Sequence, residues 1–101
     1  MRSDTLKVPG ATLYYEVRGS GPVLLLVCGG IYDAAGHAAL ADLLADRYTV
    51  VTYDRRGNSR SPLDDPSGLQ SVDDHAADVG RLAGAVAGAD PVYVFGTAPA
   101  P

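Results

Sequence analysis

The sequence predicts a single α/β domain in which a β-hairpin precedes a β-α-β-α-β run, giving a sheet of about five strands with two main helices. Three observations support this fold class. Two strand-like segments flank a Pro-Gly turn near the N-terminus, short apolar runs recur along the chain, and helix-like periodicity separates those runs. With 101 residues, 47% of them hydrophobic, the chain can form one core, so we expect one domain over residues 1–101.

The hairpin is predicted from residues 6–18. Residues 6–8 form a short apolar segment that ends at Pro9-Gly10, a dipeptide typical of turns. Residues 11–18 then alternate in character and are rich in strand formers. We therefore expect two antiparallel strands joined at residues 9 and 10.

Three further strands are predicted at residues 23–28, residues 48–53 and residues 92–95, the last beginning at Val92 and ending at Phe95. The first is an unbroken apolar run, typical of a strand that is covered on both faces. The second is rich in β-branched residues. Because helix-like segments separate these strands, we expect them to be parallel and joined by right-handed crossovers.

The first helix is predicted at residues 36–46, where Leu40, Leu43 and Leu44 have the spacing of an apolar helix face. The second helix begins at Ser71, which resembles a capping box with an aspartate three residues later. Its predicted apolar face consists of Val72, Ala76, Val79, Leu82 and Val86.

Gly80, Gly84 and Gly88 recur every fourth residue along another stripe of the second helix. Each glycine in a helix costs about 1 kcal/mol relative to alanine. Two interpretations are open: the helix is weak, or the stripe allows close approach of a neighbouring backbone.

Charge and composition exclude several classes of protein. The formal net charge is −4, and the basic residues are scattered apart from Arg55-Arg56, which argues against a nucleic-acid surface. The longest strongly apolar run, residues 23–28, is too short to span a bilayer, and no signal peptide is visible. We therefore expect a cytoplasmic protein with no membrane or nucleic-acid partner. A single cysteine excludes an intrachain disulfide, and no pattern indicates a metal or cofactor.

A polar loop follows the strand at residues 48–53, and its residues 54–61 read DRRGNSRS. Gly57 permits a tight turn with positive φ, while Asp54 and Arg56 can pin the loop by charged hydrogen bonds. The loop resembles the Asp-x-Arg-Gly-x-Gly-x-Ser loop of the α/β-hydrolase superfamily. It matches that pattern at Asp54, Arg56, Gly57 and Ser61, and Ser59 replaces the second glycine. The resemblance implies a structural role for the loop and covers only the first part of the family fold.

The resemblance also implies part of an oxyanion hole. Cys28-Gly29-Gly30 stands where the superfamily has His-Gly-Gly or His-Gly-x, and a backbone N–H just after that pair helps to form the hole. Gly30, or Ile31 beside it, is therefore the implied donor. Cys28 itself is interpreted as a small buried residue and not as a nucleophile.

The nucleophile elbow of the superfamily, Gly-x-Ser-x-Gly, follows the last predicted strand. Gly96 and Thr97 fit that pattern, but the serine position holds Ala98, which has no nucleophilic atom. Pro99 lacks the backbone N–H of the second oxyanion donor. The family's acid and histidine follow the serine, and no residue of this sequence corresponds to them. The resemblance thus implies the N-terminal half of a serine hydrolase for ester-like or related small molecules, truncated and inactive as this chain.

Two histidines are the remaining candidates for acid–base chemistry. His37 lies near the start of the first predicted helix, and His75 lies in the first turn of the second. Neither has a recognisable catalytic partner in the sequence, so both are interpreted as surface or helix-end residues.

Three functions are open at this point. The first is the truncated hydrolase, suggested by the switch to alanine and proline at residue 98. The second is a non-catalytic module that self-associates or binds a partner, because the strand from Val92 to Phe95 would be an unpaired sheet edge. The third and weakest is a nucleotide-binding unit. Gly29-Gly30 and Asp54 follow successive strands, but the Gly-x-Gly-x-x-Gly motif is absent.

Overall fold

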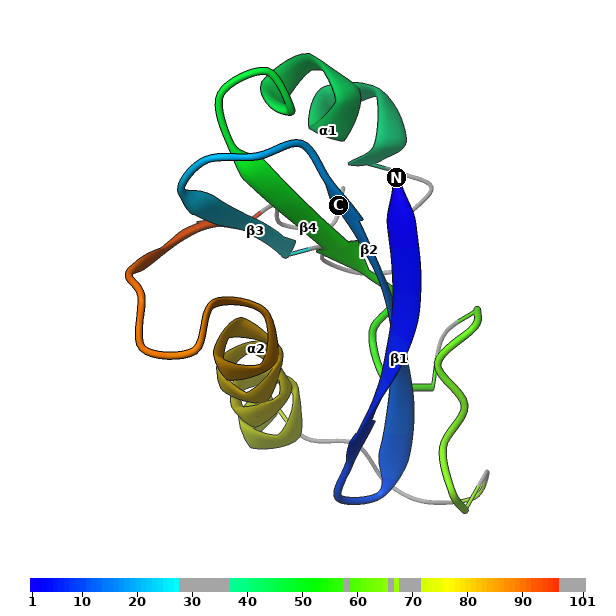
Figure 1. Ribbon diagram of the computed structural model, residues 1–101. Coiled ribbons are helices and arrows are strands. Elements are labelled where there is room, and N and C mark those ends of the chain that lie inside the picture. Colours follow the sequence, from blue (N-terminus) through cyan, green and yellow to red (C-terminus); the bar gives the residue numbers. More distant parts are fainter. Residues whose placement is uncertain (28–36, 58, 66, 68–71, 97–101) are drawn as a thin grey trace.

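A five-stranded sheet with a helix on each face forms the core of the computed structural model (Figure 1). The structure describes residues 1–27, 37–57, 59–65, 67 and 72–96. In chain order its elements are β1 (Arg2–Val8), β2 (Ala11–Arg18), β3 (Val23–Val27), α1 (Ala38–Leu44), β4 (Thr49–Tyr53), α2 (Val72–Ala87) and β5 (Val92–Gly96). The predicted α/β class, with a hairpin before the β-α-β-α-β run, is confirmed.

The strands lie in the order β1-β2-β4-β3-β5. β1 and β2 form the expected antiparallel hairpin, β2 also pairs antiparallel with β4, and β3 lies parallel between β4 and β5. β1 begins four residues before the expected start, because backbone pairing with β2 continues through polar residues such as Arg2 and Asp4. An edge strand needs no apolar pattern where its side chains are exposed.

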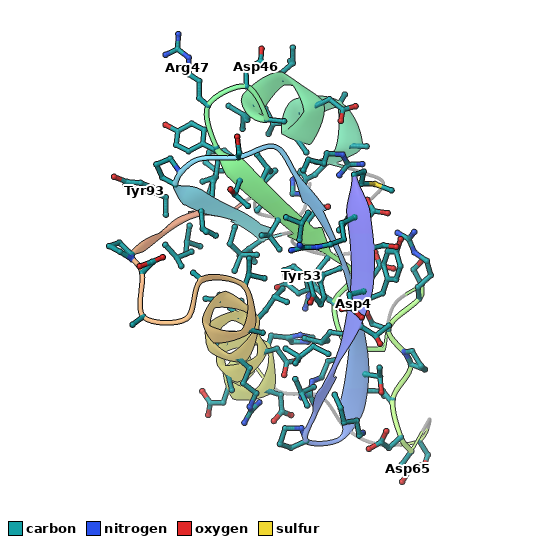
Figure 2. All side chains as sticks on the ribbon, in the orientation of Figure 1. Asp4, Asp46, Arg47, Tyr53, Asp65 and Tyr93 are labelled. Atoms are coloured by element: carbon teal, nitrogen blue, oxygen red, sulfur yellow. The ribbon has the colours of Figure 1, made fainter. Side chains whose placement is uncertain are left out.

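The two crossovers run in opposite directions along the sheet, which explains why the two helices cover opposite faces. The chain moves from β3 toward β2 to form β4, and then back past β3 to form β5. Right-handed crossovers of opposite direction place their helices on opposite sides. Leu82 of α2 packs against Leu25 and Val51, and Figure 2 shows Tyr53 between the sheet and α2. On the other face, Ala41 of α1 packs with Leu26 and Val50.

α1 differs from its prediction in length and in the face that it buries. Residues 45 and 46 lie beyond its end at Leu44. Ala41 is fully buried, whereas Leu43 is 77% exposed and Leu40 is 37% exposed, so the prediction is wrong for these two leucines. Leu44 is partly buried and packs against the core, as predicted. The small Ala41 side chain lets the helix approach the sheet, and Leu43 lies about 200° around the helix from it.

α2 buries Leu82 completely and Val79 and Val86 partly, as predicted, but Ala76 is exposed. The buried face of α2 instead includes Asp78, which lies four residues before Leu82. Ala76 lies two residues from Asp78, on the opposite side of the helix. The predicted cap at Ser71 lies outside the described residues.

The glycine stripe of α2 faces open space in the described structure. A Cβ atom built on Gly80 or Gly84 meets no atom within 4 Å. The interpretation of close backbone approach is therefore not supported within the described residues, and the weak-helix interpretation is favoured. Gly88 has φ +61, and its N–H donates to the carbonyl oxygen of Gly84, as is typical of a residue that ends a helix.

Neither helix in the described part of the chain is long and apolar enough to cross a membrane.

Candidate functional site

The carboxyl ends of the parallel strands meet at one edge of the sheet. Val27, the last residue of β3, pairs with Gly96, the last residue of β5, and Asp54 directly follows the neighbouring strand β4. In open α/β sheets this edge is where ligands bind. The residues expected at the oxyanion and nucleophile positions, Gly30, Ile31 and Ala98, lie outside the described residues. Their nearest described neighbours along the chain, Val27 and Gly96, lie side by side.

The loop after β4 is tied to itself and to β2 by backbone and hydroxyl hydrogen bonds. Gly57 has φ +79, and its N–H donates to the carbonyl oxygen of Ser61 over 2.7 Å. The Ser61 hydroxyl donates to the carbonyl oxygen of Asp54 over 2.7 Å and accepts the N–H of Tyr14 over 2.8 Å. The Asp54 N–H in turn donates to the carbonyl oxygen of Tyr14. These bonds fix the start and end of the loop against β2.

Arg56 joins the loop to α2 and to the hairpin turn. Its guanidinium donates through Nε and Nη2 to the two carboxylate oxygens of Asp78, over 2.7 Å and 2.8 Å. Nη2 also donates to the carbonyl oxygen of Pro9 over 2.9 Å. Both side chains are almost fully buried, at 6% and 2% exposed. The hydrogen bond to Asp78 raises the pKa of Arg56 above its usual value, so the guanidinium keeps its positive charge.

Asp54 is completely buried, and its carboxylate accepts hydrogen bonds from a second arginine of the loop. Arg60 donates to its carboxylate from the backbone N–H over 3.0 Å and from Nε over 2.8 Å. The hydrogen bond from the guanidinium to Asp54 raises the pKa of Arg60. The guanidinium also lies 3.9 Å from the centre of the Tyr14 ring, a cation–π distance.

Glu16 extends this ion network along β2 toward α1. Its carboxylate accepts the Tyr14 hydroxyl over 2.8 Å and lies 3.2 Å from Arg18 and 3.4 Å from Arg60. Arg18 also reaches Asp42 of α1 over 3.0 Å. No buried side-chain nitrogen or oxygen in the described ranges lacks a hydrogen-bond partner. The network therefore ties β2 to α1 and to the loop after β4.

Ser59 is the one described non-glycine residue with positive φ, at +47. It stands where the superfamily pattern has glycine. A left-handed conformation costs an L-residue about 1–2 kcal/mol, and glycine avoids this at an entropic cost of about 0.5–1 kcal/mol. We expect Ser59→Gly to raise the free energy of unfolding by about 0.5–1 kcal/mol, measured by urea denaturation.

Ser3→Gly is the matched control for this prediction, because Ser3 is an exposed residue of strand β1. There the same chemical change is expected to destabilise by about 0.5 kcal/mol. If both substitutions destabilise equally, the backbone of Ser59 carries no strain.

Both histidines lie at helix ends, as expected, but His37 is buried and not at the surface. It is 9% exposed and precedes the first turn of α1. Burial lowers the pKa of His37, and burial followed by the charge of Arg55 lowers the pKa of His75. No group of three or more His, Cys, Asp or Glu side chains within the described part of the chain could hold a metal ion.

Three residues of the site were missed by the sequence analysis: Asp78, Arg60 and Glu16. Asp78 carried a readable signal, since it lies four residues before Leu82 and thus on the apolar face of α2. A carboxylate on such a face needs a cationic partner. Arg60 and Glu16 carried no comparable signal, because their pairing depends on how the loop folds back over β2.

No family model matches the chain. The uncharacterized hydrolase YraK of Bacillus subtilis is 48% identical to it over 97 residues, which is 96% of this chain and 35% of YraK. A proposed epoxide hydrolase from Pseudomonas aeruginosa superposes with a TM-score of 0.85 at 33% identity, covering 96% of this chain and 33% of that one. An α/β hydrolase from Sphaerobacter thermophilus superposes with a TM-score of 0.80 at 35% identity, covering 92% and 35%.

The chain thus spans about a third of the length of the hydrolases that it matches.

Proposed function

The chain carries the N-terminal part of an α/β-hydrolase fold, and from that premise we propose that it is the scaffold half of a serine hydrolase for ester-like or related small molecules. In this proposal the chain supplies three parallel strands, the anchored loop after β4 and an oxyanion donor at Gly30 or Ile31. Residues beyond those 101 supply the remaining catalytic groups. The relatives are named as hydrolases, which supports the reaction class.

The observation that carries the proposal is the pairing of Val27 with Gly96. This pairing places the end of β3, from which the chain continues to Gly30 and Ile31, beside the end of β5, from which it continues to Ala98. An oxyanion hole has to stand next to the nucleophile, because its donors stabilise charge that develops on the attacked carbonyl. The loop network described above holds β4 and β2 fixed beside these strand ends.

We further propose that the 101-residue chain does not hydrolyse esters. Ala98 stands two residues after the end of β5, at the position of the elbow serine, and a methyl group cannot attack a carbonyl. Pro99 follows it and has no N–H to donate to an oxyanion.

Hydrolysis of a p-nitrophenyl ester tests both statements. The 101-residue chain is expected to match the buffer rate, and so is its Ala98→Ser variant, because a serine oxygen needs an adjacent base. A chimera that joins residues 1–96 to the elbow and C-terminal two thirds of a serine hydrolase of this fold is expected to hydrolyse the ester well above that rate.

The matched control is the same chimera with its elbow serine replaced by alanine, which should return to the buffer rate. A folded chimera that is inactive would contradict the scaffold proposal. Ester cleavage by the 101-residue chain, abolished by a substitution within it, would contradict the proposed inactivity.

A further inference from the structure

We draw no further inference here: the strongest candidate, the apolar groove of about 390 Å³ that side chains of β3, α1 and β5 line, supports no proposal, because nothing in the described part of the chain shows what covers it.

Discussion

Replacement of Arg56 by methionine is expected to lower the free energy of unfolding by about 3–5 kcal/mol. The guanidinium of Arg56 is the cation that donates from two nitrogens to the buried Asp78 carboxylate. Methionine fills similar space but leaves that carboxylate without its two shortest hydrogen bonds. Arg81, whose Nη1 lies 3.3 Å from Asp78, is 42% exposed and can replace only part of the lost interaction.

The double variant Arg56→Met, Asp78→Leu separates two contributions to the lost free energy of unfolding, the uncompensated buried charge and the lost packing. With both ions removed, no uncompensated charge stays in the core, and most of the stability should return. Lys7→Met is the exposed control, since the Lys7–Asp64 pair is more than half exposed on both sides and should cost less than about 1 kcal/mol.

Urea denaturation followed by circular dichroism measures all three variants, with an unchanged slope indicating unchanged two-state behaviour. A loss below about 1 kcal/mol for Arg56→Met would mean that Asp78 finds other partners or takes up a proton. A double variant no more stable than Arg56→Met would place the cost in packing and not in the charge.

The order of the elements could be predicted because each carries a local pattern. The Pro9-Gly10 turn marks the hairpin, and β2 begins and ends where its alternating pattern does, at Ala11 and Arg18. The strand order was not predicted, because right-handed crossovers set the face on which each helix lies but not that β3 stands between β4 and β5. The resemblance at residues 54–61 placed the loop at the end of β4, where the structure has it.

The direction in which a short helix faces could not be predicted in the same way. α1 has seven residues, and the identity of its buried residue depends on the shape of the sheet beneath it. Leucine spacing favoured Leu40, Leu43 and Leu44, but with Ala41 packed against Val50 only Leu44 of the three lies against the core. Propensity and spacing are weak guides where a helix makes few contacts.

Local sequence patterns also could not predict which residues pair in the ion network. Arg56 and Asp78 are 22 residues apart, and Arg60 and Glu16 are 44 residues apart. The sequence motif identified Asp54 and Arg56 as the charged residues that pin the loop and Gly57 as the residue with an unusual backbone conformation. Which residue each one meets depends on tertiary packing, which positions α2 and β2 against the loop.

Gly19→Ala is expected to produce a loss of similar size, about 2–5 kcal/mol, although it adds a single methyl group. Gly19 has φ +77, a left-handed conformation that costs an alanine about 1–2 kcal/mol. A Cβ atom at this position would also lie 2.3 Å from the carbonyl oxygen of Ala45 and 2.4 Å from that of Tyr48. Both are backbone atoms, so relief requires the connection between α1 and β4 to move, at a further cost of about 1–3 kcal/mol.

This close approach matters for the site because it sets how β3 starts beside β4. The turn that contains Gly19 continues to Pro22, whose carbonyl oxygen accepts the N–H of Thr49, and the Thr49 hydroxyl donates to the carbonyl oxygen of Gly21. These bonds fix the register of Val23 opposite Thr49. Because β3 is a five-residue strand paired in parallel with β4, a shift at its start is expected to move its carboxyl end too, where the chain leaves toward the oxyanion position.

Gly80→Ala is the matched control, because a Cβ atom there meets nothing within 4 Å and the residue lies inside α2. That substitution is expected to stabilise the chain by about 0.5–1 kcal/mol through helix propensity. Urea midpoints of the two variants should therefore move in opposite directions. A Gly19→Ala variant within about 1 kcal/mol of the parent would show that the turn and the connection after α1 separate easily, and the register of β3 against β4 would then need another cause.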